Sequence, residues 1–273
     1  MDGPTDPSTD LPADLNEGIL KQSDGVARIL AQLYDWEHDG FDEDVALYRA
    51  FARRTGGPVL EIACGSGRVM LGIAEEGLPV VGIDSSAVML HRAKARLERA
   101  GLAADLVAGD ITLDLPSGPF GLILAPLDGF GLVPNTELQI ALLRRVAGLL
   151  SSNGRFVFDL VALGALEGQP QGIPVLQHAG FSEELDAQAT KWIVRRVSTS
   201  SQTIELSCLY DVTWSDGVLR RYEELVALRF FSRFEIGLLL AAGGLKLEAV
   251  YGDYGLGPYT DTSERLIGVA ARI

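Results

Sequence analysis

Between residues 58 and 161, short apolar segments alternate regularly with segments of helical periodicity. A short apolar run bounded by turn residues predicts a buried strand. Such runs occupy residues 58–63, 79–84, 104–110, 120–125 and 155–161. Strands that are apolar throughout and alternate with helices are typical of a parallel sheet covered by helices on both faces. This part of the chain therefore predicts an α/β fold with a doubly wound parallel sheet.

The pattern changes in the second half of the chain. Residues 186–231 contain three long segments rich in β-branched and aromatic residues, with a Ser-Asp-Gly turn at 215–217. Long segments of this composition, separated by short turns, are typical of antiparallel strands. We therefore predict an antiparallel β insert after the fifth strand.

A final helix and two final strands complete the predicted sheet. Helical periodicity returns at Ser232 and stops at the Gly243–Gly244 pair. The segments 245–253 and 264–272 follow as strands, and the loop between them is too short for a helical crossover, so we expect them to be antiparallel. The predicted fold is a Rossmann-like doubly wound sheet of seven strands with the last strand antiparallel, plus the β insert before the last helix.

Two helix starts have the spacing of a capping box. In each, a hydroxyl residue stands three positions before a Glu or Gln whose side chain can accept a hydrogen bond from the N-cap backbone N–H. The pairs are Thr136 with Gln139 and Ser232 with Glu235. The sequence therefore predicts that Thr136 and Ser232 cap their helices.

Charge and cysteine content limit the partners and the location. The formal net charge of −14 repels phosphate backbones, which argues against nucleic acid as the main partner. Two cysteines far apart in a 273-residue chain indicate reduced thiols, and hence a cytoplasmic protein. The acidic, proline-rich start does not have the pattern of a targeting peptide, and no run is apolar enough to span a membrane.

The segment ACGSGR, residues 63–68, lies between the first strand and the next helix. Such a loop presents backbone N–H groups and a positive helix end to a ligand. A P-loop would need a lysine where Arg68 stands, and the dinucleotide fingerprint would need a glycine at Met70. Glu61, four residues before Gly65, gives a different pattern, E-x-x-x-G-x-G.

Acidic residues also end the next two strands. Asp84 ends the second strand, where a carboxylate can accept hydrogen bonds from both hydroxyls of a ribose. Asp110 ends the third strand, where it can accept from an adenine amino group. Together with Glu61, these acids predict a nucleoside site that needs no phosphate. Each acid alone could equally cap the next helix.

These motifs carry a family resemblance. EIACGSGR, VVGIDSS and AGDI resemble the successive cofactor motifs of class I S-adenosylmethionine-dependent methyltransferases. The segment LYDWEHDGF, residues 33–41, and the β insert resemble the small-molecule branch, which includes bacterial sugar N-methyltransferases and glycine or sarcosine methyltransferases. The resemblance implies S-adenosyl-L-methionine as cofactor, S-adenosyl-L-homocysteine as product, and no metal.

The resemblance also implies site residues. The implied cofactor-binding residues are Tyr34, Glu61, Ala63, Gly65, Gly67, Arg68, Asp84, Ser85, Met89, Gly109, Asp110, Ile111 and Leu127. The acceptor pocket is expected to be walled by Trp36, Phe130, Tyr254 and the insert, although these aromatic residues are equally consistent with ordinary packing. His38 and Asp128 are the candidate catalytic bases, with a solvated histidine and a turn aspartate as the alternatives.

We expect a domain organisation that follows these assignments. Residues 1–20 are expected to form a mobile acidic tail, residues 21–164 with 231–273 the cofactor-binding domain, and residues 165–230 the insert for acceptor binding or dimerisation. The predicted activity is methyl transfer to nitrogen or oxygen of a small-molecule acceptor, with a homodimer through the insert as a further prediction. Two alternatives are an NAD(P)-dependent oxidoreductase and a non-catalytic cofactor-binding module.

Overall fold

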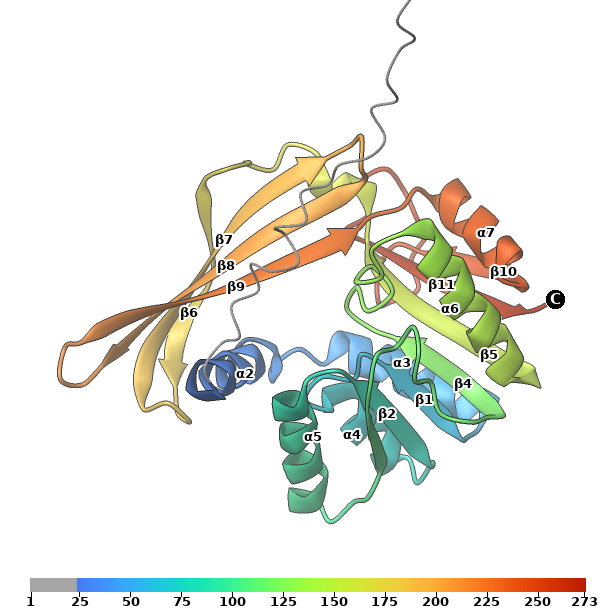
Figure 1. The fold of residues 1–273 in the computed structure, drawn as a ribbon, viewed down its shortest axis with the longest axis horizontal. Coiled ribbons are helices and arrows are strands. Elements are labelled where there is room, and N and C mark those ends of the chain that lie inside the picture. The colour runs from blue at the N-terminus through green and yellow to red at the C-terminus, as the bar shows by residue number, and fades with distance from the viewer. Residues whose placement is uncertain (1–23) are drawn as a thin grey trace, which may run out of the picture.

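The computed structural model describes residues 24–273, so the predicted tail at residues 1–20 lies outside the described residues. Two sheets dominate the fold (Figure 1). The seven-stranded sheet has the order β10-β11-β5-β4-β1-β2-β3, and the second sheet has the order β6-β7-β8-β9. The predicted fold class is confirmed, with helices around a mixed sheet and a separate antiparallel sheet.

The first half of the seven-stranded sheet alternates strands with helices. Its elements are α2 (Asp24–His38), α3 (Glu43–Thr55), β1 (Val59–Ile62), α4 (Arg68–Glu75), β2 (Val80–Asp84), α5 (Ala87–Arg99), β3 (Asp105–Ala108), β4 (Phe120–Ala125), α6 (Thr136–Leu149) and β5 (Leu150–Val161). The strands β1 to β5 pair in parallel, as predicted. Parallel pairing places the carboxyl ends of β1, β2, β3 and β4 at one edge of the sheet.

The last elements close the sheet on the side of β5. They are α7 (Arg233–Ala242), β10 (Leu245–Tyr251) and β11 (Arg265–Arg272). Strand β11 runs antiparallel to both β10 and β5, which confirms the reversed last strand. Two apolar clusters cover the sheet: α6 and α7 contribute to one, and α3 and α4 contribute to the other.

The insert forms the four-stranded sheet. Its elements are the 3-10 helix η1 (Leu163–Leu166) and the strands β6 (Pro174–Ser182), β7 (Ala187–Ser198), β8 (Thr203–Trp214) and β9 (Leu219–Arg229). All neighbouring pairs are antiparallel. Helix α2 packs on one end of this sheet, where Leu30 and Leu33 join a cluster with Tyr210 and Tyr222. The insert is thus attached to α2 as well as to β5.

The two predicted capping boxes have different outcomes. At α7, the Ser232 hydroxyl accepts a hydrogen bond from the Glu235 backbone N–H, as predicted. At α6 the prediction is wrong, because Asn135 is the N-cap and its side chain accepts from the Leu138 N–H. Gln139 is instead buried, and its side chain donates to the Val133 carbonyl.

None of the helices within residues 24–273 is long and apolar enough to cross a membrane.

Candidate functional site

Two adjoining cavities lie at the carboxyl ends of β1, β2 and β4. Their volumes are about 330 Å³ and 300 Å³, and both are lined by Ala63, Asp84 and Leu132. The larger cavity contains the predicted residues Tyr34, Glu61, Ala63, Gly65, Arg68, Asp84, Met89 and Leu127. The smaller contains Ala63, Asp84, Ser85, Asp110 and Ile111. The structure therefore brings the strand-tip motifs together around one site.

The glycine loop follows β1 in a left-handed conformation. The φ angles of Ala63, Gly65 and Gly67 are 55°, 52° and 76°. A Cβ on Gly67 would lie 2.9 Å from the Cβ of Ala93 on α5, so Gly67 is required for close packing and does not line either cavity. Gly65 lines the larger cavity, where its missing side chain lets a ligand approach the backbone.

Asp84 supports the loop from the end of β2. Its Oδ2 accepts a hydrogen bond of 2.9 Å from the Gly65 N–H, and its Oδ1 accepts one of 2.8 Å from the Ser86 N–H. Each carboxylate oxygen can accept a second bond, and Asp84 lines both cavities. The same carboxylate can therefore hold the loop and accept ligand hydroxyls.

Glu61 is a buried acid at the inner wall of the larger cavity. The residue is 3% exposed, and its Oε2 has no hydrogen-bond partner among the described residues. Burial raises the pKa of its carboxyl well above the ordinary value, against the opposing charge of Arg68. A buried carboxyl oxygen without a partner is costly, so Oε2 is ready to pair with a donor in the cavity.

Asp110 and Ile111 lie at the end of β3, beside the smaller cavity. Asp110 Oδ1 accepts hydrogen bonds of 2.7 Å from the backbone N–H and the hydroxyl of Thr112, and these bonds lower the pKa of its carboxyl. Gly109 does not line the cavity; a Cβ there would lie 2.6 Å from the Cβ of Asp114. The carboxylate of Asp110 is therefore held ionised as an acceptor.

Arg68 lies at the cavity but is already paired. Its guanidinium bonds Asp44 at 2.7 and 2.5 Å and donates to the Phe41 carbonyl. The Asp44 side chain is fully buried. Arg68, one of the implied cofactor-binding residues, is therefore already engaged in an ion pair, which also joins α3 to the start of α4.

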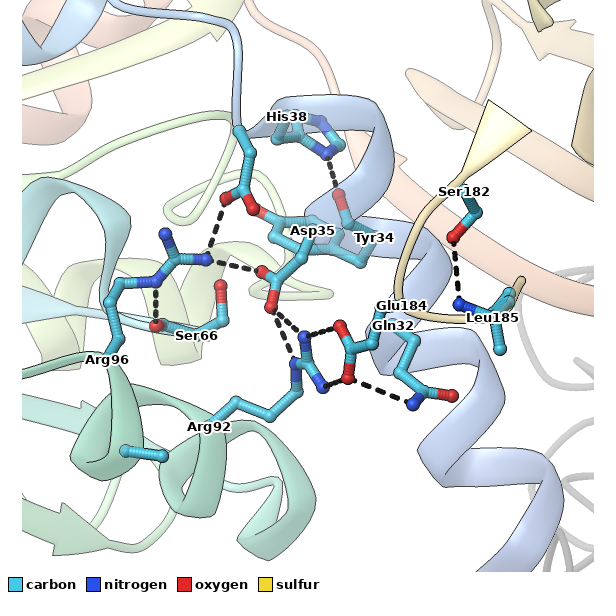
Figure 2. Close-up of polar contacts among 12 residues, drawn as sticks. Gln32, Tyr34, Asp35, His38, Ser66, Arg92, Arg96, Ser182, Glu184 and Leu185 are labelled. Carbon is cyan, nitrogen blue, oxygen red and sulfur yellow. Dashed lines mark hydrogen bonds and ion pairs between the residues drawn. The ribbon is translucent and has the colours of Figure 1, made fainter. Parts of the chain in front are cut away.

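Helix α2 lies over the glycine loop and is held there by ion pairs. Figure 2 shows Arg92 between the carboxylates of Asp35 and Glu184, at 2.6 and 2.7 Å. Arg96 pairs with Asp35 at 2.9 Å and donates to the Ser66 carbonyl at 3.0 Å. The network joins α2, α5, the loop and the β6–β7 turn. It fixes the helix that carries Tyr34 into the cavity.

His38 ends α2 and stacks on the Tyr34 ring, with the ring centroids 4.2 Å apart. Its Nδ1 lies 2.8 Å from the Tyr34 carbonyl oxygen, so Nδ1 carries the proton and Nε2 is the free acceptor. Burial lowers the pKa of its imidazole, against the opposing charge of Glu37. His38 does not itself line the two cavities.

The first prediction concerns this imidazole. We expect His38 to titrate below its ordinary pKa of about 6.5 in the folded protein, because burial disfavours the charged form. As the pH falls through 6.5 the unfolded chain takes up the proton first, so the unfolding free energy decreases towards the folded pKa. NMR of the imidazole C–H signals measures the pKa, and His38→Gln assigns the signal. A value at or above the ordinary pKa would contradict the buried placement.

Asp128, the second candidate base, has a structural role. Its Oδ1 accepts a 2.6 Å hydrogen bond from the Val161 N–H, and its Oδ2 pairs with Arg265 at 3.1 Å. Both oxygens are thus occupied, although the residue lines the larger cavity. Leu127 and Asp128 have φ angles of 43° and 65°, and the Leu127 N–H donates to Asp159. Asp128 therefore fixes the turn after β4, and its ion pair with Arg265 competes with a role as a base.

The predicted aromatic wall of the acceptor pocket needs correction. Phe130 is 1% exposed and packs in the core against Phe158 and Phe231, so it does not reach the cavity. Trp36 packs in the cluster between α2 and the insert. Tyr254 lies beside Phe41 and donates its hydroxyl to Asp159 at 2.7 Å. None of the three lines either cavity.

Among the lining residues of the larger cavity that the sequence analysis missed are one leucine and three residues of the insert. They are Leu132 in the loop after β4, and Glu224, Val226 and Leu228 on β9. The three β9 residues alternate along the strand and therefore share one face. The alternation of side chains along the strand could have grouped these three residues, but the sequence alone does not show which face of β9 lines the cavity.

Comparisons with known proteins identify a methyltransferase domain in this chain. Residues 59–154 match a family model described as a methyltransferase domain. The chain is 29% identical over 149 residues to the ribosomal protein L11 methyltransferase of Thermus thermophilus, a match that spans 54% of each chain. It is 27% identical over 225 residues to the cypemycin N-terminal methyltransferase of a Streptomyces species, covering 80% of this chain and 84% of the relative. A solved structure, the sugar N-methyltransferase KedS8 from Streptoalloteichus, has the same fold with a TM-score of 0.68 at 19% identity, covering 88% and 92% of the two chains.

Proposed function

Because the chain is an S-adenosylmethionine-dependent methyltransferase, we propose that it transfers a methyl group to a nitrogen or oxygen atom of a small-molecule acceptor. One observation carries the proposal. A single cavity is lined by the strand-tip acids Glu61 and Asp84 and by Glu224, Val226 and Leu228 of the insert. Such a cavity can hold a nucleoside-bearing cofactor and an acceptor side by side.

The residues present fit this cofactor. The unpartnered Oε2 of Glu61 offers an acceptor where the amino group of a methionyl moiety requires one. Asp84 has free lone pairs for the ribose hydroxyls, and Asp110 with the Ile111 N–H is placed to bind the adenine. When bound, the cofactor supplies a methyl group on a positively charged sulfur, which a nucleophile can attack.

The protein's own task is to position the acceptor and exclude water. Alignment of two bound reactants can contribute about 7–11 kcal/mol to lowering the barrier. The wall formed by Leu132, Val226 and Leu228 supplies the apolar surface for this. For a hydroxyl acceptor a general base is needed, and our candidate is His38, which lines neither cavity but stacks on the cavity residue Tyr34.

The size and charge of the site favour a small acceptor. The larger cavity is lined by residues of the seven-stranded sheet and of the insert and has a volume of about 330 Å³, which suits a small molecule. The net charge of −14 disfavours nucleic acid. A cytoplasmic location and a homodimer through the insert remain predictions. Leu225 on β9 is 73% exposed, which is consistent with a dimer contact on that face of the insert.

The second prediction tests the cofactor. Titration with S-adenosyl-L-homocysteine, followed by calorimetry and thermal unfolding, is expected to give saturable binding. A ligand at a hundred times its dissociation constant stabilises the folded state by about 2.7 kcal/mol. NAD and NADP serve as controls and are expected to have no effect, because Met70 replaces the third glycine of the dinucleotide fingerprint. Binding of NAD without binding of S-adenosyl-L-homocysteine would favour the oxidoreductase alternative.

Activity is then measured by release of S-adenosyl-L-homocysteine in the presence of small amines and alcohols. Turnover with an amine or an alcohol would support the proposed reaction. Tight cofactor binding without turnover on any of them would favour the non-catalytic module.

A further inference from the structure

Strand β9 of the insert brings one carboxylate to the acceptor end of the cavity. Glu224, Val226 and Leu228 line it together, and Glu224 pairs in register with Cys208 on β8. Towards the other end of the strand, Tyr222 lies on the same face and packs in the cluster that contains α2. Glu224 thus lies where the apolar packing of the insert stops and the cavity begins.

The neighbouring charges leave Glu224 without a close cation. Lys191 on β7 is buried, and its Nζ lies 2.5 Å from Glu37 Oε2 on α2. Glu37 therefore neutralises the charge of Lys191 at close range. The Glu224 carboxylate accepts no hydrogen bond from residues 24–273 at standard geometry, and it interacts with Lys191 and Glu37 only through longer-range charge. Together the three groups bring one net negative charge to the cavity wall.

Cations elsewhere on the cavity wall are also paired. Arg68 is paired with Asp44, and Arg265, behind the wall, is paired with Asp128. Asp84, a further acid of the lining, adds negative potential. An anionic acceptor would meet repulsion here, whereas a cationic acceptor would gain a direct partner.

We propose that Glu224 is the residue that selects the acceptor, by forming an ion pair with the ammonium group of a small amine whose hydrocarbon part packs on Val226 and Leu228. The inference rests on the proposed function, because it concerns the acceptor end of the same cavity. It narrows the acceptor class from a nitrogen or oxygen nucleophile to a basic amine.

The same carboxylate can accept the proton that an ammonium group must lose. The N–H bond of the ammonium breaks, the proton moves to an Oε of Glu224, and the electron pair remains on nitrogen as the lone pair. Burial raises the pKa of the Glu224 carboxyl, with Lys191 opposing and Glu37 assisting. A higher pKa makes the carboxylate a stronger base. The thiol of Cys208 and the hydroxyl of Tyr210 are the other titratable groups that face it from β8.

The third prediction is a binding experiment with matched probes. The protein is saturated with S-adenosyl-L-homocysteine, so that the cofactor end is filled, and titrated with cyclohexylamine, cyclohexanol and cyclohexanecarboxylate by ligand-observed NMR. We expect the amine to bind about tenfold or more tightly than the alcohol, as a charged hydrogen bond implies, and the carboxylate to bind least.

Two variants assign this preference to one residue. Glu224→Gln keeps the size of the side chain but removes its charge, and is expected to abolish the preference for the amine. Glu223→Gln, one residue earlier on the opposite face of β9, is the matched control and is expected to retain it. Affinity for S-adenosyl-L-homocysteine is measured for each variant and is expected to remain unchanged.

The outcomes separate this inference from the proposed function. Equal affinity for amine and alcohol, no binding of the amine, or an unchanged preference in Glu224→Gln would overturn the role of Glu224. In each of these cases retained binding of S-adenosyl-L-homocysteine would leave the proposed function standing. Loss of that binding in the unmodified protein would instead remove the proposed function itself.

Discussion

Asp84→Ala is expected to weaken the binding of S-adenosyl-L-homocysteine by about 100-fold or more. The substitution removes the acceptor for two ribose hydroxyls, and each hydrogen bond to a charged group contributes about 1.5–3 kcal/mol. It also releases the Gly65 N–H, to which the carboxylate is bonded at 2.9 Å, and so loosens the loop that lines the cavity. Calorimetric titration of the variant measures the loss directly.

Asp105→Ala controls for the general effect of removing a carboxylate near the site. Asp105 is exposed at the start of the neighbouring strand β3 and lines neither cavity. Asp105→Ala is therefore expected to bind with unmodified affinity. Asp84→Asn keeps one carbonyl acceptor, so its affinity for S-adenosyl-L-homocysteine is expected to lie between those of Asp84→Ala and Asp105→Ala. If Asp84→Ala bound within about threefold of the unmodified protein, the placement of the ribose would be wrong.

The convergence of the strand-tip acids could be predicted from sequence because these residues come from short local motifs. Asp84 and Asp110 each end a strand that is easily read from its apolar pattern. Parallel strands connected by helices present their carboxyl ends at the same edge, so these acids must converge once the fold class is known. The positive φ angles of Gly65 and Gly67 were implied by the glycines themselves.

The acceptor end could not be predicted in the same way. Glu224 and Val226 reach the cavity because β9 packs with a particular face towards the first sheet, and that packing depends on contacts with α2 and β5 far away in sequence. The turn after β4 determines which side chains of the following loop point into the cavity and which point into the core. Its left-handed residues, Leu127 and Asp128, send Leu132 to the cavity and Phe130 to the core.

One strand of the insert was missed for a related reason. Strand β6 contains Pro174, Gly180 and several polar residues, and most of its side chains are exposed because it lies at the edge of its sheet. An edge strand needs little apolar pattern, so periodicity gives a weak signal there. Its position follows from pairing with β7, which is a tertiary property.

Asp159→Ala is expected to lower the free energy of unfolding by about 3–5 kcal/mol, the cost of leaving a buried charge without its partner. Asp159 on β5 is 0% exposed. Its carboxylate accepts hydrogen bonds from Arg265 on β11, from the Tyr254 hydroxyl at 2.7 Å and from the Leu127 N–H at 3.1 Å. The substitution would therefore leave a buried guanidinium with only Asp128 as its partner.

Asp159→Ala is also expected to weaken ligand binding, because it removes the hydrogen-bond partner of Leu127, which lines the larger cavity. Urea unfolding followed by circular dichroism measures the stability, and calorimetry with S-adenosyl-L-homocysteine measures the consequence for the turn after β4. Arg221→Ala breaks an ion pair with Asp211 from the solvent side and serves as the control, with no measurable loss of stability expected. A loss below about 1 kcal/mol for Asp159→Ala would mean that water replaces the carboxylate, and that Asp128 alone holds Arg265 and the turn in place.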